Sequence, residues 1–126
     1  MGFACPQCSE NSLAIGRSIE LPADSRSDEI ALQMVKCESC EFRGLAVYQE
    51  SRRGALDSES WEHVGYQING QDLKIIVDLI NMCPQPRDAG CHCLAHHSLG
   101  GQNDHGRWSG LNNFDVTSTF AMQRIG

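Results

Sequence analysis

The residues of this chain with the clearest capacity for chemistry are its cysteines. Four of them form two C-x-x-C pairs, Cys5-Pro-Gln-Cys8 and Cys37-Glu-Ser-Cys40, with 28 residues between the pairs. A gap of two residues lets both thiolates of a pair point into one tight turn, so each pair supplies half of a tetrahedron. Four soft thiolates at about 2.3 Å complete the coordination sphere of Zn²⁺ and leave no position for water. Cys5, Cys8, Cys37 and Cys40 are therefore predicted to form a structural zinc site that does not catalyse.

A second group of potential ligands lies near residue 90. Cys83, Cys91 and Cys93 are followed closely by His96 and His97. A helical turn beginning after Cys93 lets either histidine reach a metal ion held by the three thiolates. The two groups use all seven cysteines of the chain, and one histidine supplies the eighth ligand. We predict a second zinc site formed by Cys83, Cys91, Cys93 and His96, with His97 as the alternative to His96, which gives two Zn²⁺ in all.

Strands are predicted to position the first two pairs. Apolar residues alternate with a period of two over three short runs, at 13–21, 30–37 and 44–48. This period is typical of antiparallel strands with one covered face. In the first run, four residues are expected to share one face of the sheet: Leu13, Ile15, Ile19 and Leu21.

These N-terminal 50 residues resemble the zinc-ribbon superfamily, on the strength of the two C-x-x-C turns and the strands between and after them. The resemblance implies a three-stranded antiparallel ribbon closed by one zinc ion. It implies little about function, because a fold of this kind carries many unrelated functions.

Other interpretations of the cysteines stay open. A rubredoxin-like iron centre also uses two C-x-x-C pairs, but rubredoxins have glycine after the second cysteine of each pair, where this chain has Ser9 and Glu41. The first four cysteines can also be read as reactive dithiols or disulfides. In the second group, the cysteines can be buried small apolar residues, or three ligands of a catalytic zinc whose fourth ligand is water.

The rest of the chain is predicted to hold one strand and one helix. Residues 51–60 lack periodicity and indicate a linker or loop, and alternation over 61–68 predicts a strand. Asn69 is expected to cap a helix that ends at Cys83, because Pro84 disfavours a helical residue before it. Residues 84–126 carry no regular pattern and end in a Gly/Asn-rich tail.

The sequence thus predicts a small α+β metal-bound protein. Residues 1–50 form the zinc ribbon, 51–60 the linker or loop, and 61–126 a strand-helix segment with a Cys/His-rich second zinc-binding loop and the tail, packed as one unit with the ribbon. Apolar residues make up 40% of the chain and aromatic residues only 6%. A core of that composition is thin, and small cores usually need support from metals or disulfides.

Charge and the N-terminal sequence suggest a compartment and a partner. The first eleven residues have neither the basic stretch nor the apolar run of a signal peptide, and no segment reaches the roughly 18–20 apolar residues of a membrane span. We therefore expect a cytoplasmic protein without membrane contact, where paired cysteines bind metal rather than each other. The net charge is −6, and about −9 with both zinc sites filled, since the sites leave −2 and −1.

An acidic chain without recognisable catalytic motifs is predicted to be a non-catalytic zinc-binding adaptor or regulatory protein. Its acidic surface suits a protein partner with a basic face. The first alternative is a nucleic-acid-associated zinc-ribbon protein that uses Arg43, Arg52 and Arg53. The second is a metalloenzyme that uses the 83–97 site.

Overall fold

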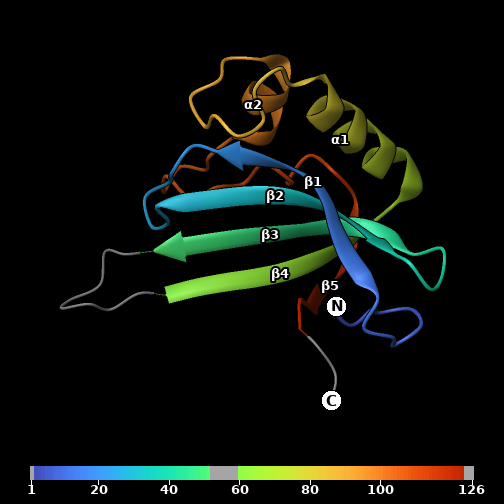
Figure 1. Ribbon diagram of the computed structural model, residues 1–126. Coiled ribbons are helices and arrows are strands. Elements are labelled where there is room, and N and C mark those ends of the chain that lie inside the picture. Colours follow the sequence, from blue (N-terminus) through green and yellow to red (C-terminus); the bar gives the residue numbers. More distant parts are fainter. Residues whose placement is uncertain (1, 52–59, 124–126) are drawn as a thin grey trace.

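The protein forms one antiparallel sheet with two helices packed against it (Figure 1). The computed structural model describes residues 2–51 and 60–123, and within them the five strands lie in sequence order across the sheet. The elements are β1 (Leu13–Leu21), β2 (Glu29–Cys37), β3 (Arg43–Ser51), β4 (Ser60–Ile68), α1 (Gly70–Met82), α2 (Leu94–Leu99) and β5 (Val116–Ala121). The predicted α+β class is confirmed, whereas α2 and β5 were not predicted. None of the described helices has the length and apolar character needed to cross a membrane.

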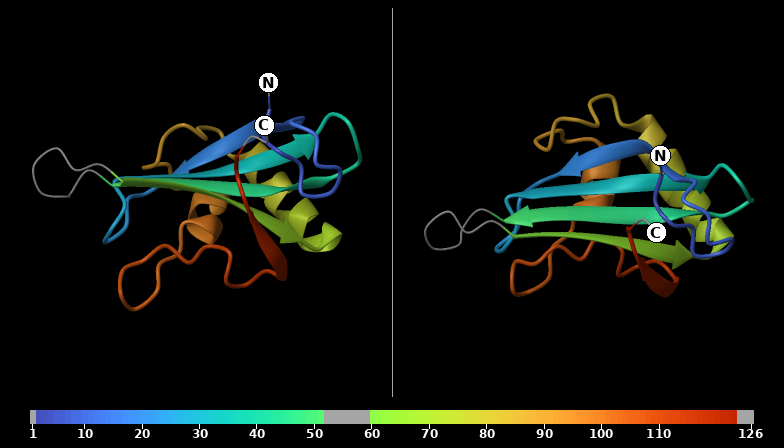
Figure 2. Two further views of the ribbon diagram at one scale, coloured as in Figure 1. Left: turned by 90° about the horizontal axis from the view of Figure 1, so that it is seen from below. Right: turned by 60° about the horizontal axis from the view of Figure 1, so that its bottom comes forward.

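Both helices lie on one face of the sheet, and the chain termini lie on the other side (Figure 2). The predicted division into 1–50 and 61–126 falls between β3 and β4. These two strands pair directly, from Leu45 opposite Tyr66 to Ser51 opposite Ser60. The predicted linker or loop at 51–60 lies mostly outside the described residues, so the domain division stays a prediction.

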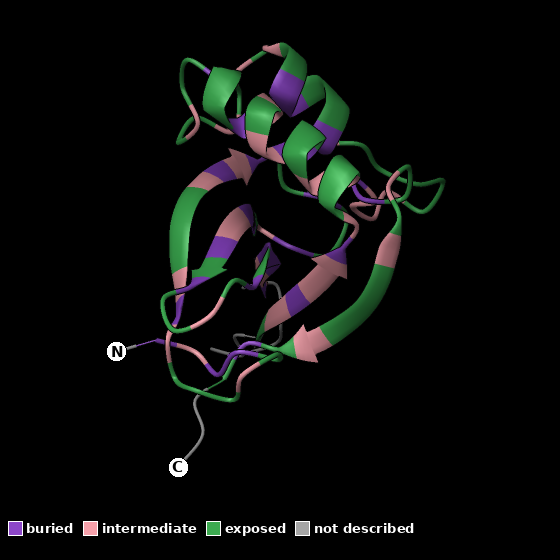
Figure 3. Ribbon diagram, turned by 90° about the vertical axis from the view of Figure 1, so that its right-hand side faces the viewer, coloured by how far each residue is buried: buried purple, intermediate pink, exposed green. Residues whose placement is uncertain are grey.

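The main core fills the space between the sheet and the helices. Leu32 and Leu45 from the central strands are fully buried against Ile76 and Ile80 of α1. These two helix residues are one turn apart, so they form the apolar stripe that α1 presents to the sheet. The outward side of the same helix is exposed in Figure 3.

A β-bulge in β1 divides the apolar residues of that strand between the two faces of the sheet. Ile15 lies opposite Val35 and Ser18 opposite Gln33, so β1 contains one extra residue between these pairs. Because side chains alternate, one extra residue moves every later side chain to the opposite face. Leu13 therefore joins a second apolar cluster around the first cysteines, and Ile19 joins the main core. The prediction that all four apolar residues of β1 share one face was wrong.

The start of α1 follows the predicted capping pattern. The Asn69 side-chain oxygen accepts a hydrogen bond from the Asp72 backbone N–H at 2.8 Å, and Cys83 caps the C-terminus. The Asp72 carboxylate turns instead toward the tail, where it accepts a hydrogen bond from the Asp115 N–H at 2.7 Å. This bond fixes the point at which the chain enters β5.

Strand β5 pairs with β4, so the tail closes the edge of the sheet. The aromatic ring of Phe120 lies over Gly65, where a Cβ atom would collide with it. The glycine thus allows Phe120 to pack edge to face against Phe42, with ring centroids 5.7 Å apart. The remaining side chains of β5 are mostly exposed and polar, which is why hydrophobic alternation did not reveal this strand.

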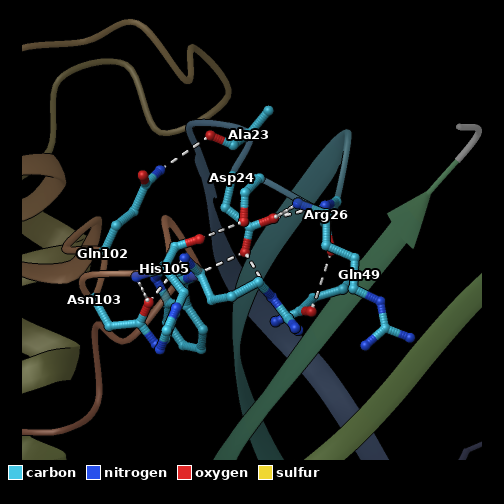
Figure 4. A network of polar contacts seen from close by, with 11 residues as sticks. Ala23, Asp24, Arg26, Gln49, Gln102, Asn103 and His105 are labelled. Carbon is cyan, nitrogen blue, oxygen red and sulfur yellow. Dashed lines mark hydrogen bonds and ion pairs between the residues drawn. The ribbon is translucent and has the colours of Figure 1, made fainter.

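The buried carboxylate of Asp24 attaches the loop before β5 to the β1–β2 turn (Figure 4). It accepts hydrogen bonds from the backbone N–H groups of Arg26 and Ser27 at 2.8 and 2.6 Å. It also accepts one from the N–H of Trp108 at 2.7 Å, and the guanidinium of Arg107 lies 3.7 Å away. Burial alone would raise the pKa of Asp24, but these N–H donors and the cation outweigh it and lower the pKa.

Asp24→Asn is therefore expected to destabilise the protein by about 2 kcal/mol, because the replacement removes the charge that three N–H groups and Arg107 face. Since the folded-state pKa is lowered, the contribution of Asp24 is present at neutral pH. It is lost as the pH falls below about 4. Urea denaturation at pH 7 and pH 3, with hydrogen exchange of the Trp108 amide, measures both effects. Asp104→Asn, an exposed carboxylate in the same loop, is the control; equal losses for the two variants would contradict the assignment.

Candidate metal centres

The first four cysteines converge from two turns that are 28 residues apart in sequence. Cys5 and Cys8 lie in the turn before β1, which is closed by a pair of hydrogen bonds between the backbones of Phe3 and Leu13 at 2.8 and 2.9 Å. The second turn connects β2 to β3, and it is closed by the hydrogen bond from the Cys37 N–H to the Phe42 carbonyl at 2.9 Å. The β1–β2 pairing, with Leu13 opposite Cys37, sets the two turns side by side.

The spacing of the four sulfur atoms fits a tetrahedral metal site. Cys5 Sγ lies 3.6 Å from Cys40 Sγ, Cys8 Sγ lies 3.7 Å from Cys37 Sγ, and all four lie within 4.8 Å of one another. A tetrahedron with Zn–S bonds of about 2.3 Å has edges of about 3.8 Å. The four thiols thus surround a space of the size that one ion with four thiolate ligands requires.

Backbone N–H groups point at these sulfur atoms from within both turns. The hydrogen bonds run from Gln7 N–H to Cys5 at 3.4 Å, from Ser39 N–H to Cys37 at 3.3 Å and from Phe42 N–H to Cys40 at 3.5 Å. Ser9, directly after Cys8, adopts a left-handed backbone with φ of 67°. This is the position where glycine would be unstrained, so the turn holds its shape despite a side chain.

The thiols of this group differ in acidity. A hydrogen bond between the Ser12 hydroxyl and Cys37 Sγ, 3.2 Å long, is the largest influence that lowers the pKa of Cys37 to about 6. The Phe42 N–H lowers the pKa of Cys40, but burial and the neighbouring thiols outweigh it and raise that pKa to about 12. One thiolate is therefore available near neutral pH, and the binding of a cation must displace protons from the others. No sequence pattern pointed to Ser12, because its contact with Cys37 arises from strand pairing.

The second group lies where the two helices meet the edge of the sheet. Cys83 caps the C-terminus of α1 and Cys93 caps the N-terminus of α2. His96 Nδ1 lies 3.3 Å from Cys83 Sγ and 3.2 Å from Cys93 Sγ, and Cys91 completes a set whose ligand atoms all lie within 4.8 Å of one another. The structure thus brings together the three cysteines and His96, while the side chain of His97 is exposed and outside this set.

The orientation of the His96 ring is fixed from outside the group. His96 is 4% exposed, and its Nε2 lies 2.8 Å from the backbone carbonyl oxygen of Glu20 in β1. A carbonyl can only accept, so Nε2 carries the proton and Nδ1 presents a lone pair to the three sulfur atoms. A carbonyl that holds the second ring nitrogen in this way is typical of metal-bound histidines. Sequence reasoning could not identify Glu20, because it contributes a backbone atom.

Two of these thiols also have opposite acidity shifts. Burial raises the pKa of the Cys83 thiol to about 11, and the neighbouring Cys93 adds to the shift. Burial also acts to raise the pKa of Cys93, but hydrogen bonds with His96 outweigh it and lower that pKa to about 6. As in the first group, a single thiolate is accessible at neutral pH, and a cation is required to ionise the rest.

Each set of four donors is sufficient to close a tetrahedral coordination sphere. Among the described residues, these are the two groups of three or more Cys, His, Asp or Glu side chains that converge closely enough to hold a metal ion. Both are rich in sulfur, which favours soft or borderline cations over Mg²⁺ or Ca²⁺. The class of protein is thus defined by geometry: a small α+β protein with two Cys/His clusters compatible with metal binding. Comparisons with protein families, with curated proteins and with solved structures found no significant match for the chain.

Serine substitutions are expected to separate the two clusters. Cys37→Ser should prevent folding of the first 50 residues at ordinary temperature, because metal binding and folding are coupled in such sites. Cys91→Ser should increase hydrogen exchange over residues 83–123 and leave the first cluster intact. Thermal melting, peptide-resolved hydrogen exchange and metal content measure these effects. A variant that melts like the parent would show that its cluster does not stabilise the fold.

The histidine assignment is tested by comparing adjacent residues. His96→Gln is expected to remove one of two bound metal equivalents, whereas His97→Gln should keep both, because the His97 side chain points away from the sulfur atoms. In the parent protein, ¹⁵N chemical shifts should show a protonated Nε2 on His96. Metal loss in His97→Gln, or a protonated Nδ1 on His96, would contradict the geometry.

Proposed function

We propose that the protein is a non-catalytic zinc-binding adaptor or regulatory protein whose two Zn²⁺ ions stabilise the fold. The observation that carries the proposal is that each cluster offers four protein donors. A catalytic zinc keeps one position for water or substrate, whereas a structural zinc has four protein ligands. The donor sets, Cys₄ and Cys₃His, are those of structural zinc sites, and the metal would be held in place by residues from both ends of each cluster.

The first cluster supports membership of the zinc-ribbon superfamily in the sense inferred from the sequence. Its two pairs lie in turns closed by short backbone hydrogen bonds, and the strands β1, β2 and β3 that carry these turns are antiparallel neighbours. Each turn directs N–H groups at its sulfur atoms, which lowers the free energy of the ionised thiolates. This arrangement is what a three-stranded ribbon around a zinc ion requires.

An acidic surface for a basic protein partner lies on the open face of the sheet. Glu29 lies opposite Glu50 in the β2–β3 register, and Glu50 lies opposite Trp61 in the β3–β4 register, so all three side chains are on the face away from the helices. Glu20 of β1 is on this face too. Burial raises the pKa of Glu20, and the negative charge of Glu29 adds to the shift, as expected of neighbouring carboxylates.

Trp61 gives this surface an aromatic contact point. Its side chain is 65% exposed, an unusual exposure for tryptophan, and its ring stacks on Tyr48 with centroids 6.4 Å apart. The outer side of the indole is thus open to a cationic side chain of a partner, with carboxylates nearby to attract it. The nucleic-acid alternative relied on Arg43, Arg52 and Arg53, of which Arg52 and Arg53 lie outside the described residues.

A titration with an arginine-rich peptide tests this function. We expect binding that weakens with salt, and Trp61→Ala should weaken it about threefold, the size of an exposed cation–π contact. Ile75→Ala, an exposed apolar residue on α1, serves as the control and should have no effect. Fluorescence anisotropy with labelled peptide provides the dissociation constants. The proposal fails if a labelled oligonucleotide binds more tightly than the peptide, or if Trp61→Ala binds like the parent.

A further inference from the structure

An apolar groove runs between α1 and the sheet, at the end nearest the second C-x-x-C turn. Its volume is about 300 Å³, and its walls include Met34 of β2 with Leu73 and Val77 of α1. Leu73 and Val77 are one turn apart on the helix, so they form a continuous apolar wall. Met34 and Leu73 also pack against the main core, which makes this surface an extension of the core toward solvent.

The groove exists because β1 has no side chain to fill it. Gly16 lies at the β-bulge and lines the groove. A Cβ atom at Gly16 would approach no atom closer than 3.8 Å, the distance to the Met34 carbonyl oxygen, so the backbone itself has room for a side chain there. Gly44, on the far wall, differs because a Cβ atom there would lie 2.9 Å from the Tyr66 carbonyl oxygen.

Two cations stand at one end of this groove. Lys36 and Arg43 line it, lie directly opposite each other in the β2–β3 register and are exposed. Like charges placed opposite each other in a sheet are unfavourable. In the described part of the chain, neither cation has a carboxylate within ion-pair distance, although the protein carries a net charge of −6. A local pair of unneutralised cations beside an apolar surface is the arrangement that an apolar ligand with an anionic end requires.

We propose that this groove binds a medium-chain carboxylic acid, with its acyl chain along Met34, Leu73 and Val77 and its carboxylate between Lys36 and Arg43. The groove volume corresponds to about ten groups of water size, and a methylene group is of similar size. Burial of each methylene contributes about 0.8 kcal/mol at most. The two cations fix the direction of the chain in the groove.

A bound peptide fits this groove less well than an acyl chain. The backbone groups of β2 and β3 beside it are paired with each other, as in the pairs Val35–Gly44 and Lys36–Arg43. An extended peptide would therefore bring its own N–H and C=O groups against an apolar surface without partners, which is costly. An acyl chain has no such groups, and its one polar end meets the two cations.

Titration of the metal-loaded full chain with decanoate, followed by ¹H–¹⁵N NMR below the micelle concentration, tests the proposal. Amide shifts are expected at Gly16, Leu73 and Val77, with decan-1-ol binding about tenfold more weakly because it lacks the charge. The double substitution Lys36→Gln and Arg43→Gln should weaken decanoate binding about tenfold, equivalent to 1.4 kcal/mol. Arg87→Gln, an exposed arginine outside the groove, should bind like the parent.

Gly16→Leu supplies a second test that does not alter charge. Its side chain is expected to occupy the groove and abolish binding, while the melting temperature stays close to that of the parent. Equal affinities for decanoate and decan-1-ol, or decanoate binding that survives both the double substitution and Gly16→Leu, would overturn the proposal. Because these tests leave Trp61 and the peptide titration untouched, the failure of this site and the failure of the adaptor function are distinguishable.

Discussion

Soft donor atoms gathered from distant segments into two small volumes are the constraint on which this fold depends. Cys5 and Cys40 are separated by 34 residues in the chain, yet their sulfur atoms lie 3.6 Å apart. Thiols held this close repel one another when ionised, which is why Cys40 and Cys83 have raised pKa values. A divalent cation removes that repulsion and converts each cluster from a burden into a source of stability. A thin apolar core of this composition gains most from such a contribution.

The sheet allows both clusters to act on one structure. The main core and α1 lie on one face, and the first cluster lies on the other face with its own apolar residues, including Phe42 and Met122. The bulge in β1 is what lets a single strand serve both, since it directs Leu13 to one face and Ile19 to the other. The second cluster then attaches both helix ends to β1 through the bond from His96 to the Glu20 carbonyl.

The members of both clusters could be named from the sequence, because paired spacing and the count of cysteines leave few combinations. The α+β class, the main helix and its Asn69 cap could also be predicted, since periodicity and capping are local properties. The face assignment of β1 could not, because a bulge is visible only in the register with β2. Strand β5 was missed because its exposed side chains are polar and its pairing with β4 is set by Gly65 and Phe120. The Asp24 network was missed because its partners are backbone N–H groups from a distant loop. That the clusters bind zinc stays a prediction.

The loop of the second cluster also covers part of the free edge of the sheet. The Glu20 N–H, on the outer side of β1, donates to the Pro86 carbonyl oxygen at 2.7 Å, one residue from the strand's end at Leu21. Strand edges with unpaired N–H and C=O groups are templates on which other chains can add strands, and proteins commonly cover them with loops. A loop held by Cys83, Cys91 and His96 therefore couples metal occupancy to colloidal behaviour. Removal of the ion would uncover the end of β1 and give the apo protein a route to self-association through its sheet.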